Sequence, residues 1–201
     1  MEHSEPGPSA HPAAFNPAAF NPVAAWGEVR QLGYVVPAHT LAQHLEHWGR
    51  VMGLGPWLLV EHPPVTEFVH RGTPGELDFT IAIAHLGALQ VELIAQHSDQ
   101  PSTYLDFLDR NPDGGLHHVA WWPDDMDAAE ALAASAGWEL WSGGRIGPHG
   151  RFRYYVTESH PGTVIELAEV TGRRLEYFET QFAGWSRTYD PRSDELFVVR
   201  N

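Results

Sequence analysis

The chain has 201 residues, no cysteine and a formal net charge of -14 at neutral pH. This length suits one domain, or two small modules that share a core. Without cysteine there is no disulfide framework, so a metal would need nitrogen and oxygen ligands. The acidic balance argues against nucleic-acid partners and anionic membrane surfaces, and no apolar run reaches the length of a membrane span. The first residues lack the features of a signal peptide, so we expect a cytoplasmic protein.

Residues 1–26 are rich in proline, alanine and serine, and they repeat the sequence AAFNP at positions 13–17 and 18–22. Asn-Pro pairs disfavour helix, so this stretch is predicted to be a mostly disordered arm. The apolar residues with which such an arm would dock on the domain or on a partner subunit are Phe15, Phe20 and Trp26.

The next stretch predicts a strand, a helix and three further strands. The helix begins after Thr40 as its N-cap, and its buried stripe at helical spacing would consist of Leu41, Leu45, Trp48 and Met52. The strands are predicted at residues 29–36, 57–61, 77–84 and 89–95, with a loop between the second and the third. A carboxylate, Glu92, interrupts the apolar run of the fourth strand. A short helix is expected at residues 102–108.

The same order then restarts. The stretch GGLHHVAWW at residues 114–122 predicts a strand that leaves a glycine turn and carries His117 and His118 on opposite faces. A helix at 127–136, a loop at 142–150 and strands at 138–141, 152–157 and 163–170 complete this half. VELIA at 91–95 and IELA at 165–168 are at equivalent places, which indicates an internal repeat. A last helix is expected at 173–184, and residues 196–199 are left unassigned.

Five motifs in this order resemble the vicinal oxygen chelate superfamily, which includes glyoxalase I, bleomycin-resistance proteins and extradiol dioxygenases. They are LGYVVP at 32–37, VEL at 91–93, GLHHVAW at 115–121, DDMDAA at 124–129 and VIEL at 164–167. The closest likeness is to methylmalonyl-CoA epimerase. The resemblance implies an α+β fold of paired βαβββ modules, whose mostly antiparallel sheet curls into a cup. The expected domain spans 27–171, with modules at 27–112 and 113–171, between the arm at 1–26 and a C-terminal helix and tail at 172–201.

The resemblance also implies a divalent metal in the cup, held by Gln31, Glu92, His118 and Glu166. The residues themselves point to the same strands, because a carboxylate inside an apolar strand is costly unless it is paired, protonated or bound to metal. Gln31 replaces the histidine that is usual at its position. The remaining donor set suits Mg²⁺, Mn²⁺, Co²⁺, Ni²⁺ or Zn²⁺, but a protein without metal stays open. The two-histidine triad of extradiol dioxygenases is absent.

By resemblance, the function would be that of a metal-dependent isomerase, epimerase or lyase that acts next to a carbonyl through a stabilised enolate. Glu166, and after it Glu92, would move the proton. The expected substrate contacts are Trp122, Tyr104, Tyr154, Arg153 and Thr80, the last near the place of the epimerase's additional acid/base carboxylate. The loop arginines Arg145, Arg151 and Arg153 could bind an anionic group. The alternative is a metal-free, resistance-type protein that binds a hydrophobic or aromatic small molecule. In either case we expect a homodimer.

Overall fold

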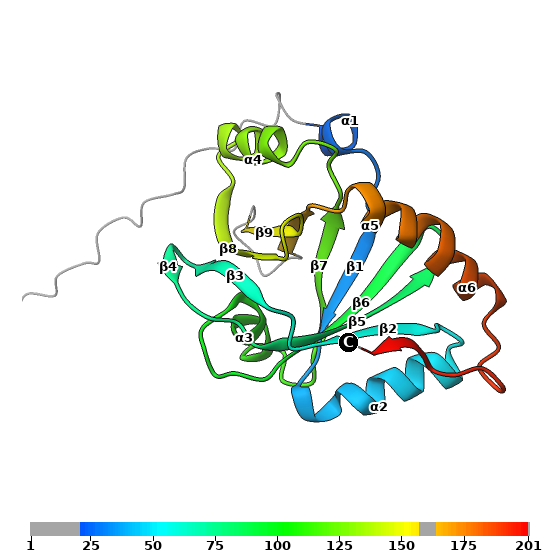
Figure 1. Ribbon diagram of the computed structural model, residues 1–201. Helices are drawn as coiled ribbons and strands as arrows, with labels where there is room; N and C mark the ends of the chain where they lie inside the picture. Colours follow the sequence, from blue (N-terminus) through cyan, green and yellow to red (C-terminus); the bar gives the residue numbers. More distant parts are fainter. Residues whose placement is uncertain (1–20, 157–163, 201) are drawn as a thin grey trace, which may run out of the picture.

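The computed structural model describes residues 21–156 and 164–200 (Figure 1). The predicted arm falls mostly on residues 1–20, which lie outside this range, as do Phe15 and Phe20. The helical elements are α1 (Pro22–Trp26), η1 (Ala38–Thr40), α2 (Leu41–Glu46), η2 (His47–Val51), α3 (Thr103–Leu108), α4 (Met126–Ser135), α5 (Gly172–Glu176), η3 (Tyr177–Phe182) and α6 (Ala183–Thr188). None of these described helices is long and apolar enough to cross a membrane.

The strands of the described chain join one eleven-stranded sheet in the order β11-β2-β5-β6-β1-β7-β10-β9-β8-β3-β4. Their bounds are β1 (Gln31–Val35), β2 (Trp57–Glu61), β3 (Val65–His70), β4 (Thr73–Pro74), β5 (Phe79–Leu86), β6 (Leu89–Gln96), β7 (Gly115–Trp121), β8 (Glu139–Ile146), β9 (Arg151–Val156), β10 (Val164–Ala168) and β11 (Phe197–Arg200).

The two halves of the sheet have the same internal arrangement. The first strand of each pairs in parallel with the last, β1 with β6 and β7 with β10, and the halves meet where β1 runs antiparallel to β7. The predicted α+β fold of two glyoxalase-like modules is therefore confirmed.

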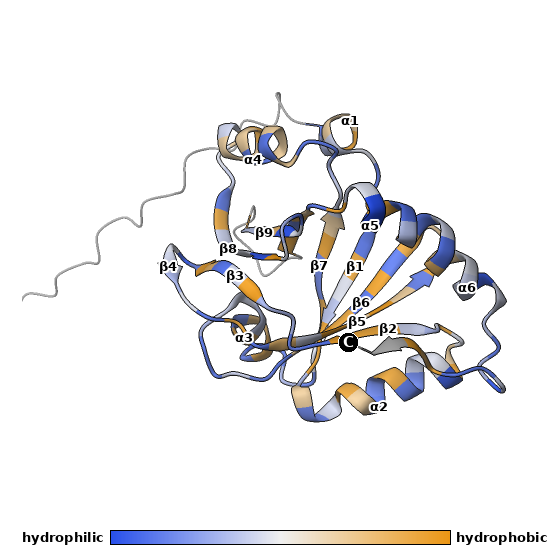
Figure 2. Cartoon of the chain, in the orientation of Figure 1, coloured by the Kyte–Doolittle hydropathy of each residue, from blue (hydrophilic) through white to orange (hydrophobic). Residues whose placement is uncertain are grey.

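Alternation along β5 separates two cores. Phe79, Ile81 and Ile83 face into the cup, where they join a cluster that includes Phe178 and Phe182 of the C-terminal segment. The intervening alanines of β5 pack on the other side of the sheet, in the cluster that contains the buried residues of α2. Hydrophobic and hydrophilic residues alternate along α2, as expected of a helix with one buried side (Figure 2). The C-terminal segment thus covers the cup, and α2 covers the opposite face.

Three strands were not predicted. β3 and β4 lie in the expected loop after β2, and β11 uses the unassigned tail. The strand predicted at 138–141 is β8, which continues through Ile146 into the expected loop at 142–150. β3 pairs with β8 of the other half, and its register shifts between Thr66 and Val69, around the positive φ of Glu67. Because a bulge interrupts the alternation of side chains, the local pattern of β3 did not indicate a strand.

The helix after β1 ends earlier than its apolar pattern predicts. Leu41 and Leu45 are buried and Trp48 is half-buried, but Met52 is 60% exposed, so its predicted burial is wrong. The backbone passes into a π-turn at η2, where Met52 N–H donates to the carbonyl of His47, and the wider turn rotates Met52 off the buried side. Thr40 occupies the N-cap position, but its hydroxyl donates to the carbonyl of Pro37 rather than capping the helix.

The described end of the arm packs on the second half of the domain. Asn21 caps α1 by accepting from the N–H groups of Val23 and Ala24. Trp26 is buried, with its ring 6.1 Å from that of Trp121 and 5.2 Å from that of Trp138. One of the residues expected to dock the arm therefore does so on the same chain.

Candidate metal centre

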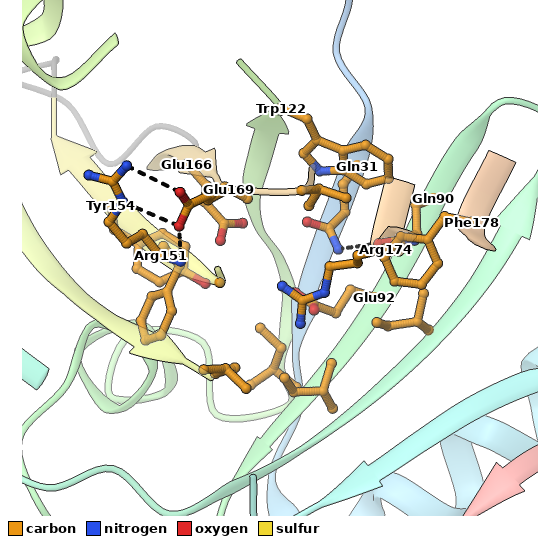
Figure 3. A pocket seen from close by; sticks show the side chains of 18 of the residues that line it. Gln31, Gln90, Glu92, Trp122, Arg151, Tyr154, Glu166, Glu169, Arg174 and Phe178 are labelled. Atoms are coloured by element: carbon orange, nitrogen blue, oxygen red, sulfur yellow. Dashed lines mark hydrogen bonds and ion pairs between the residues drawn. The ribbon is translucent and has the colours of Figure 1, made fainter. Parts of the chain in front are cut away.

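A cavity of about 80 Å³ lies inside the cup (Figure 3). One wall comes from β1, β5 and β6, the other from β9 and β10, and the C-terminal segment contributes Arg174 and Phe178. The lining from β5 is apolar and consists of Phe79, Ile81 and Ile83. The polar lining includes two carboxylates from the predicted set, Glu92 and Glu166.

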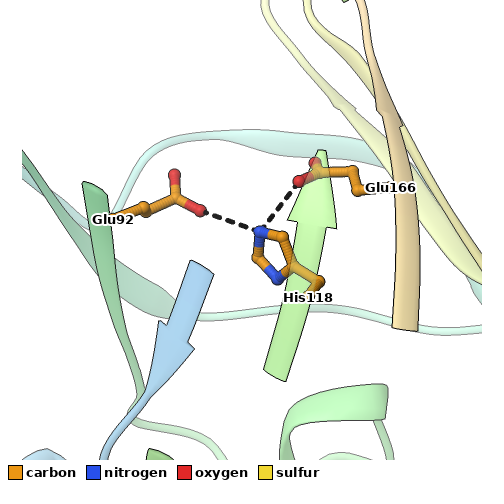
Figure 4. Close-up of side chains that lie close together, drawn as sticks. All are labelled: Glu92, His118 and Glu166. Atoms are coloured by element: carbon orange, nitrogen blue, oxygen red, sulfur yellow. Dashed lines mark ion pairs between the residues drawn. The ribbon is translucent and has the colours of Figure 1, made fainter. Parts of the chain in front are cut away.

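The histidine of the predicted set lies between these two carboxylates (Figure 4). His118 Nε2 is 2.9 Å from Glu166 Oε2 and 3.6 Å from Glu92 Oε2. The sheet brings them together: Gly33 of β1 pairs with Glu92 on one side and with His118 on the other, while β10 places Glu166 beside β7. We call Glu92, His118 and Glu166 the acidic cluster.

The acidic cluster is buried, and burial sets its electrostatics. Desolvation raises the pKa of Glu92, and the nearby charge of Glu166 acts in the same direction. Desolvation by itself would lower the pKa of His118, but the charges of Glu166 and Glu92 outweigh it and raise the pKa to about 9. Without a bound cation, a protonated His118 would therefore compensate part of the negative charge.

His118 is oriented by its neighbour in the sequence. Its Nδ1 lies 3.0 Å from Nδ1 of His117, whose Nε2 lies 3.0 Å from Thr103 Oγ1. Desolvation, and then the charge of His118, lower the pKa of His117 well below its ordinary value, so His117 is neutral. We therefore assign the shared hydrogen to His118 Nδ1, with His117 as acceptor. This arrangement directs Nε2 of His118 towards the carboxylates.

The acidic cluster fits a divalent cation. Its three ligand atoms lie within 4.8 Å of one another, and all three residues are buried. His118 Nε2 and Glu166 Oε2 face each other as an ion pair at 2.9 Å, but neither atom makes a hydrogen bond of good geometry in the described chain. Buried polar atoms are rarely left without partners, and two carboxylates would neutralise a divalent charge. Residues that could hold such a cation are therefore present.

Gln31, the fourth predicted ligand, lines the same cavity but is engaged elsewhere. Its Nε2 donates to Oε1 of Gln90 at 2.7 Å, and Gln90 Nε2 in turn lies 3.3 Å from Nε2 of His85. Gln31 in β1 and His118 in β7 occupy equivalent positions of the two halves. Across the β1–β7 pair, Gln31 lies opposite Ala120, and His118 lies opposite Gly33. The structure thus brings three of the four predicted residues into one cluster and leaves Gln31 beside it.

The predicted substrate contacts divide into two groups. Trp122, Tyr104 and Tyr154 line the cavity, and the two tyrosine hydroxyls lie 2.9 Å apart. Thr80 and Arg153 are not in its lining, which corrects that prediction. Thr80 points to the other side of the sheet, with its hydroxyl 2.7 Å from His97 Nε2, because its position in β5 alternates with the residues that face the cup.

The predicted loop arginines already have partners. Arg153 donates to the carbonyls of Gly144 and Phe152 and pairs with Glu130. Arg145 pairs with Glu67, and Arg151, which lines the cavity, pairs with Glu169 at 3.2 Å. These contacts fasten β8 and β9 to their neighbours. They leave little capacity for an anionic ligand at the guanidinium groups that the sequence had indicated.

Arg174 in α5 also lines the cavity, and the sequence reading missed it. A signal was available in the sequence, because residues four apart share a helical face and the apolar Phe178 follows Arg174 by four residues in the predicted last helix.

The matching family model is described as the glyoxalase/bleomycin resistance protein/dioxygenase superfamily, and it covers residues 30–155. The chain belongs to this superfamily. Glu166 and the C-terminal segment lie beyond the matched residues. No curated protein matches the chain in sequence.

Solved structures show the same fold. Methylmalonyl-CoA epimerase from Mycobacterium tuberculosis superposes with a TM-score of 0.53 at 19% identity, over 76% of this chain and 93% of that one. A hypothetical protein from Bacillus halodurans C-125 superposes with a TM-score of 0.51 at 15% identity, over 72% of this chain and 95% of that one. At such identities the likeness concerns the fold.

Proposed function

We propose that the protein is a divalent-metal-dependent isomerase, epimerase or lyase that acts next to a carbonyl group. One observation carries the proposal: two carboxylates and an imidazole converge in a buried cup, with His118 Nε2 and Glu166 Oε2 lacking hydrogen-bond partners in the described chain. When bound, a divalent cation would act as a Lewis acid towards a substrate oxygen and stabilise the charge that develops there.

The chain itself supplies the proton carrier. β5 presents only apolar side chains to the cavity, so the acid/base role falls to Glu166 and, after it, to Glu92. In this proposal Glu166 accepts a proton from the carbon beside the carbonyl. In an epimerase Glu92 then delivers a proton to the opposite face of that carbon, and in an isomerase Glu166 returns its proton to a neighbouring atom. Water would be excluded from the deprotonated substrate by the aromatic side chains of Trp122, Tyr104 and Tyr154.

A second candidate is a metal-free protein that binds a hydrophobic or aromatic small molecule. The hydrogen bond between Gln31 and Gln90 favours it, because the usual fourth ligand is replaced by a side chain that has another partner. The pKa of about 9 for His118 favours it too, since an imidazolium can compensate the carboxylates without a metal ion.

Metal analysis separates the two candidates. The protein is purified without chelator, its metal content is measured, and the stripped protein is titrated with Mn²⁺, Co²⁺ and Zn²⁺ by calorimetry. We expect one tight site per chain that is lost in His118→Ala. His39→Ala is the matched control, because His39 is exposed and distant in sequence from the acidic cluster. Equal metal affinity in the wild type and His118→Ala would refute the metal site.

Substrate, assembly and location remain proposals. The similar structure from M. tuberculosis is a methylmalonyl-CoA epimerase. Methylmalonyl-CoA is therefore the first substrate to test, with proton exchange at its α-carbon as the readout. Exchange reports formation of the enolate, and product analysis separates an epimerase from a lyase, because only the lyase cleaves a bond from carbon to carbon or oxygen. A homodimer and a cytoplasmic location, expected from the sequence, can be checked by light scattering and fractionation.

A further inference from the structure

Arg174 is placed at the cavity by the segment that follows the last strand of the cup. Its side chain points into the pocket on the side of Glu92, whereas Arg151 points towards Glu169 on the other side (Figure 3). The guanidinium lies against Gly150, where an added Cβ would be 2.9 Å from Arg174 Nη1. Arg174 belongs to α5, beyond the residues 30–155 that the family model covers.

Arg174 is the unpaired one of the two arginines that line the cavity. Arg151 has close ion pairs, including Glu169 at 3.2 Å, but Arg174 has neither a hydrogen bond nor an ion pair with any residue that the structure describes. Desolvation lowers the pKa of Arg174, and the charges of Glu92 and Glu169 oppose that effect. Part of the side chain is nevertheless exposed to solvent. The guanidinium is thus crowded by protein yet accessible to a ligand that enters the cavity.

The helical segment that carries Arg174 is firmly attached to the cup. Phe178 is buried, with its ring 5.9 Å from that of Trp122, and Phe182 packs against His85 with ring centroids 5.1 Å apart. Glu179 accepts a hydrogen bond of 2.8 Å from Arg30, which directly precedes β1. These contacts fix the backbone that carries Arg174 before a ligand arrives, which lowers the entropic cost of binding.

We infer that Arg174 binds a carboxylate of the substrate, and that the substrate is a small carbonyl compound with a free carboxylate. This inference rests on the proposed function, because it places the reacting carbonyl at the acidic cluster. A guanidinium offers a planar pair of donors that matches a carboxylate. Glu92, Glu166 and Glu169 would repel an anion, and Arg174 is the free cation of the described lining that offsets them. A cavity of about 80 Å³ has room for a small acyl group, so the remainder of a larger substrate would lie outside.

Calorimetric binding of malonate tests the inference, with malonamide as the uncharged isostere. Both are titrated into Mn²⁺-loaded wild type, Arg174→Gln, Arg174→Lys and the control Arg173→Gln, whose side chain is exposed on the same helix. We expect malonate affinity to fall at least about tenfold in Arg174→Gln and less in Arg174→Lys, which keeps the charge but loses the planar fork. Arg173→Gln should match the wild type, and malonamide should not distinguish the variants.

Equal malonate affinity in the wild type and Arg174→Gln, or no malonate binding to the wild type, would overturn the inference. Inorganic phosphate that binds more tightly than malonate would overturn the carboxylate assignment. Metal titration of each variant keeps the two proposals separate. If the wild type binds no metal while malonate still depends on Arg174, the proposed function fails and the anion site stands. If the wild type binds metal but malonate affinity does not depend on Arg174, the proposed function stands and the anion site at Arg174 fails.

Discussion

Gly33 and His118 pair directly across β1 and β7, and the imidazole of His118 occupies the space above Gly33. A Cβ at Gly33 would lie 1.8 Å from His118 Cε1 and 1.9 Å from Nε2. The missing side chain at Gly33 therefore lets the imidazole reach between Glu92 and Glu166.

Gly33→Ala should displace the imidazole and abolish tight metal binding. The overpacked site should also lower the free energy of unfolding by about 1–3 kcal/mol. Metal titration and urea unfolding measure the two effects. Gly184→Ala serves as the control, because an added Cβ there meets nothing within 4 Å. Normal metal affinity in Gly33→Ala would show that His118 does not need its present position.

His117 should determine metal affinity without touching the metal. His117→Phe removes the acceptor for Nδ1 of His118, which lies 3.0 Å away, and should weaken metal binding by about 10–100-fold. His117→Asn keeps an acceptor oxygen and should weaken binding less. Competition titration with a chromogenic chelator measures both. If the two variants behave alike, the hydrogen bond to His118 is not what orients the ligand.

Gln31→His tests whether the position of the missing ligand is still usable. The new imidazole would lie in the same cavity as the acidic cluster, and we expect metal affinity to rise by roughly tenfold. The variant also loses the hydrogen bond to Gln90, which should lower the free energy of unfolding by about 1 kcal/mol. Gln31→Ala loses the same bond without gaining a ligand, so the difference in metal affinity between these two variants isolates the imidazole. No difference between them would mean that position 31 cannot reach the metal.

His85 should make the protein sensitive to mild acid. Desolvation, and then the charge of Arg30, lower its pKa to about 4, below the ordinary value of 6.5. As the pH falls below 6.5, His85 becomes protonated in the unfolded chain while it stays neutral in the folded protein. The folded state therefore loses free energy of unfolding progressively between pH 6.5 and about pH 4. Between pH 7 and pH 5 this group alone should lower the free energy of unfolding by about 2 kcal/mol.

Urea unfolding of the wild type and His85→Gln at both pH values checks this expectation. Glutamine cannot take up the proton but retains an acceptor for Gln90, so the variant should lose less stability than the wild type on acidification. His39→Gln, at an exposed position, should behave as the wild type. An identical loss in His85→Gln would show that His85 is not the group responsible.

The sequence alone determined the repeat and the residues that face the cup. Strand alternation has a period of two, so a polar residue inside an apolar strand reveals which face it is on. That rule singled out the strands of Glu92, His118 and Glu166, and the family resemblance supplied the expectation that these side chains share one site. Trp122 and Tyr154, which were expected as substrate contacts, line the same cavity. The expectation for Thr80 was wrong because that residue was located by alignment with a family position, whereas alternation along its own strand points it away from the cup.

Only the tertiary structure decided what each of these side chains contacts. Gln31 faces the cup as predicted, yet whether it joins the acidic cluster depends on Gln90 of a neighbouring strand. The pairing of β3 with β8 and the position of Arg174 over the cavity likewise join parts of the chain that are far apart in sequence. Periodicity reports the face of an element that is buried, but not the partner that buries it, because that partner is set by packing among all the elements together.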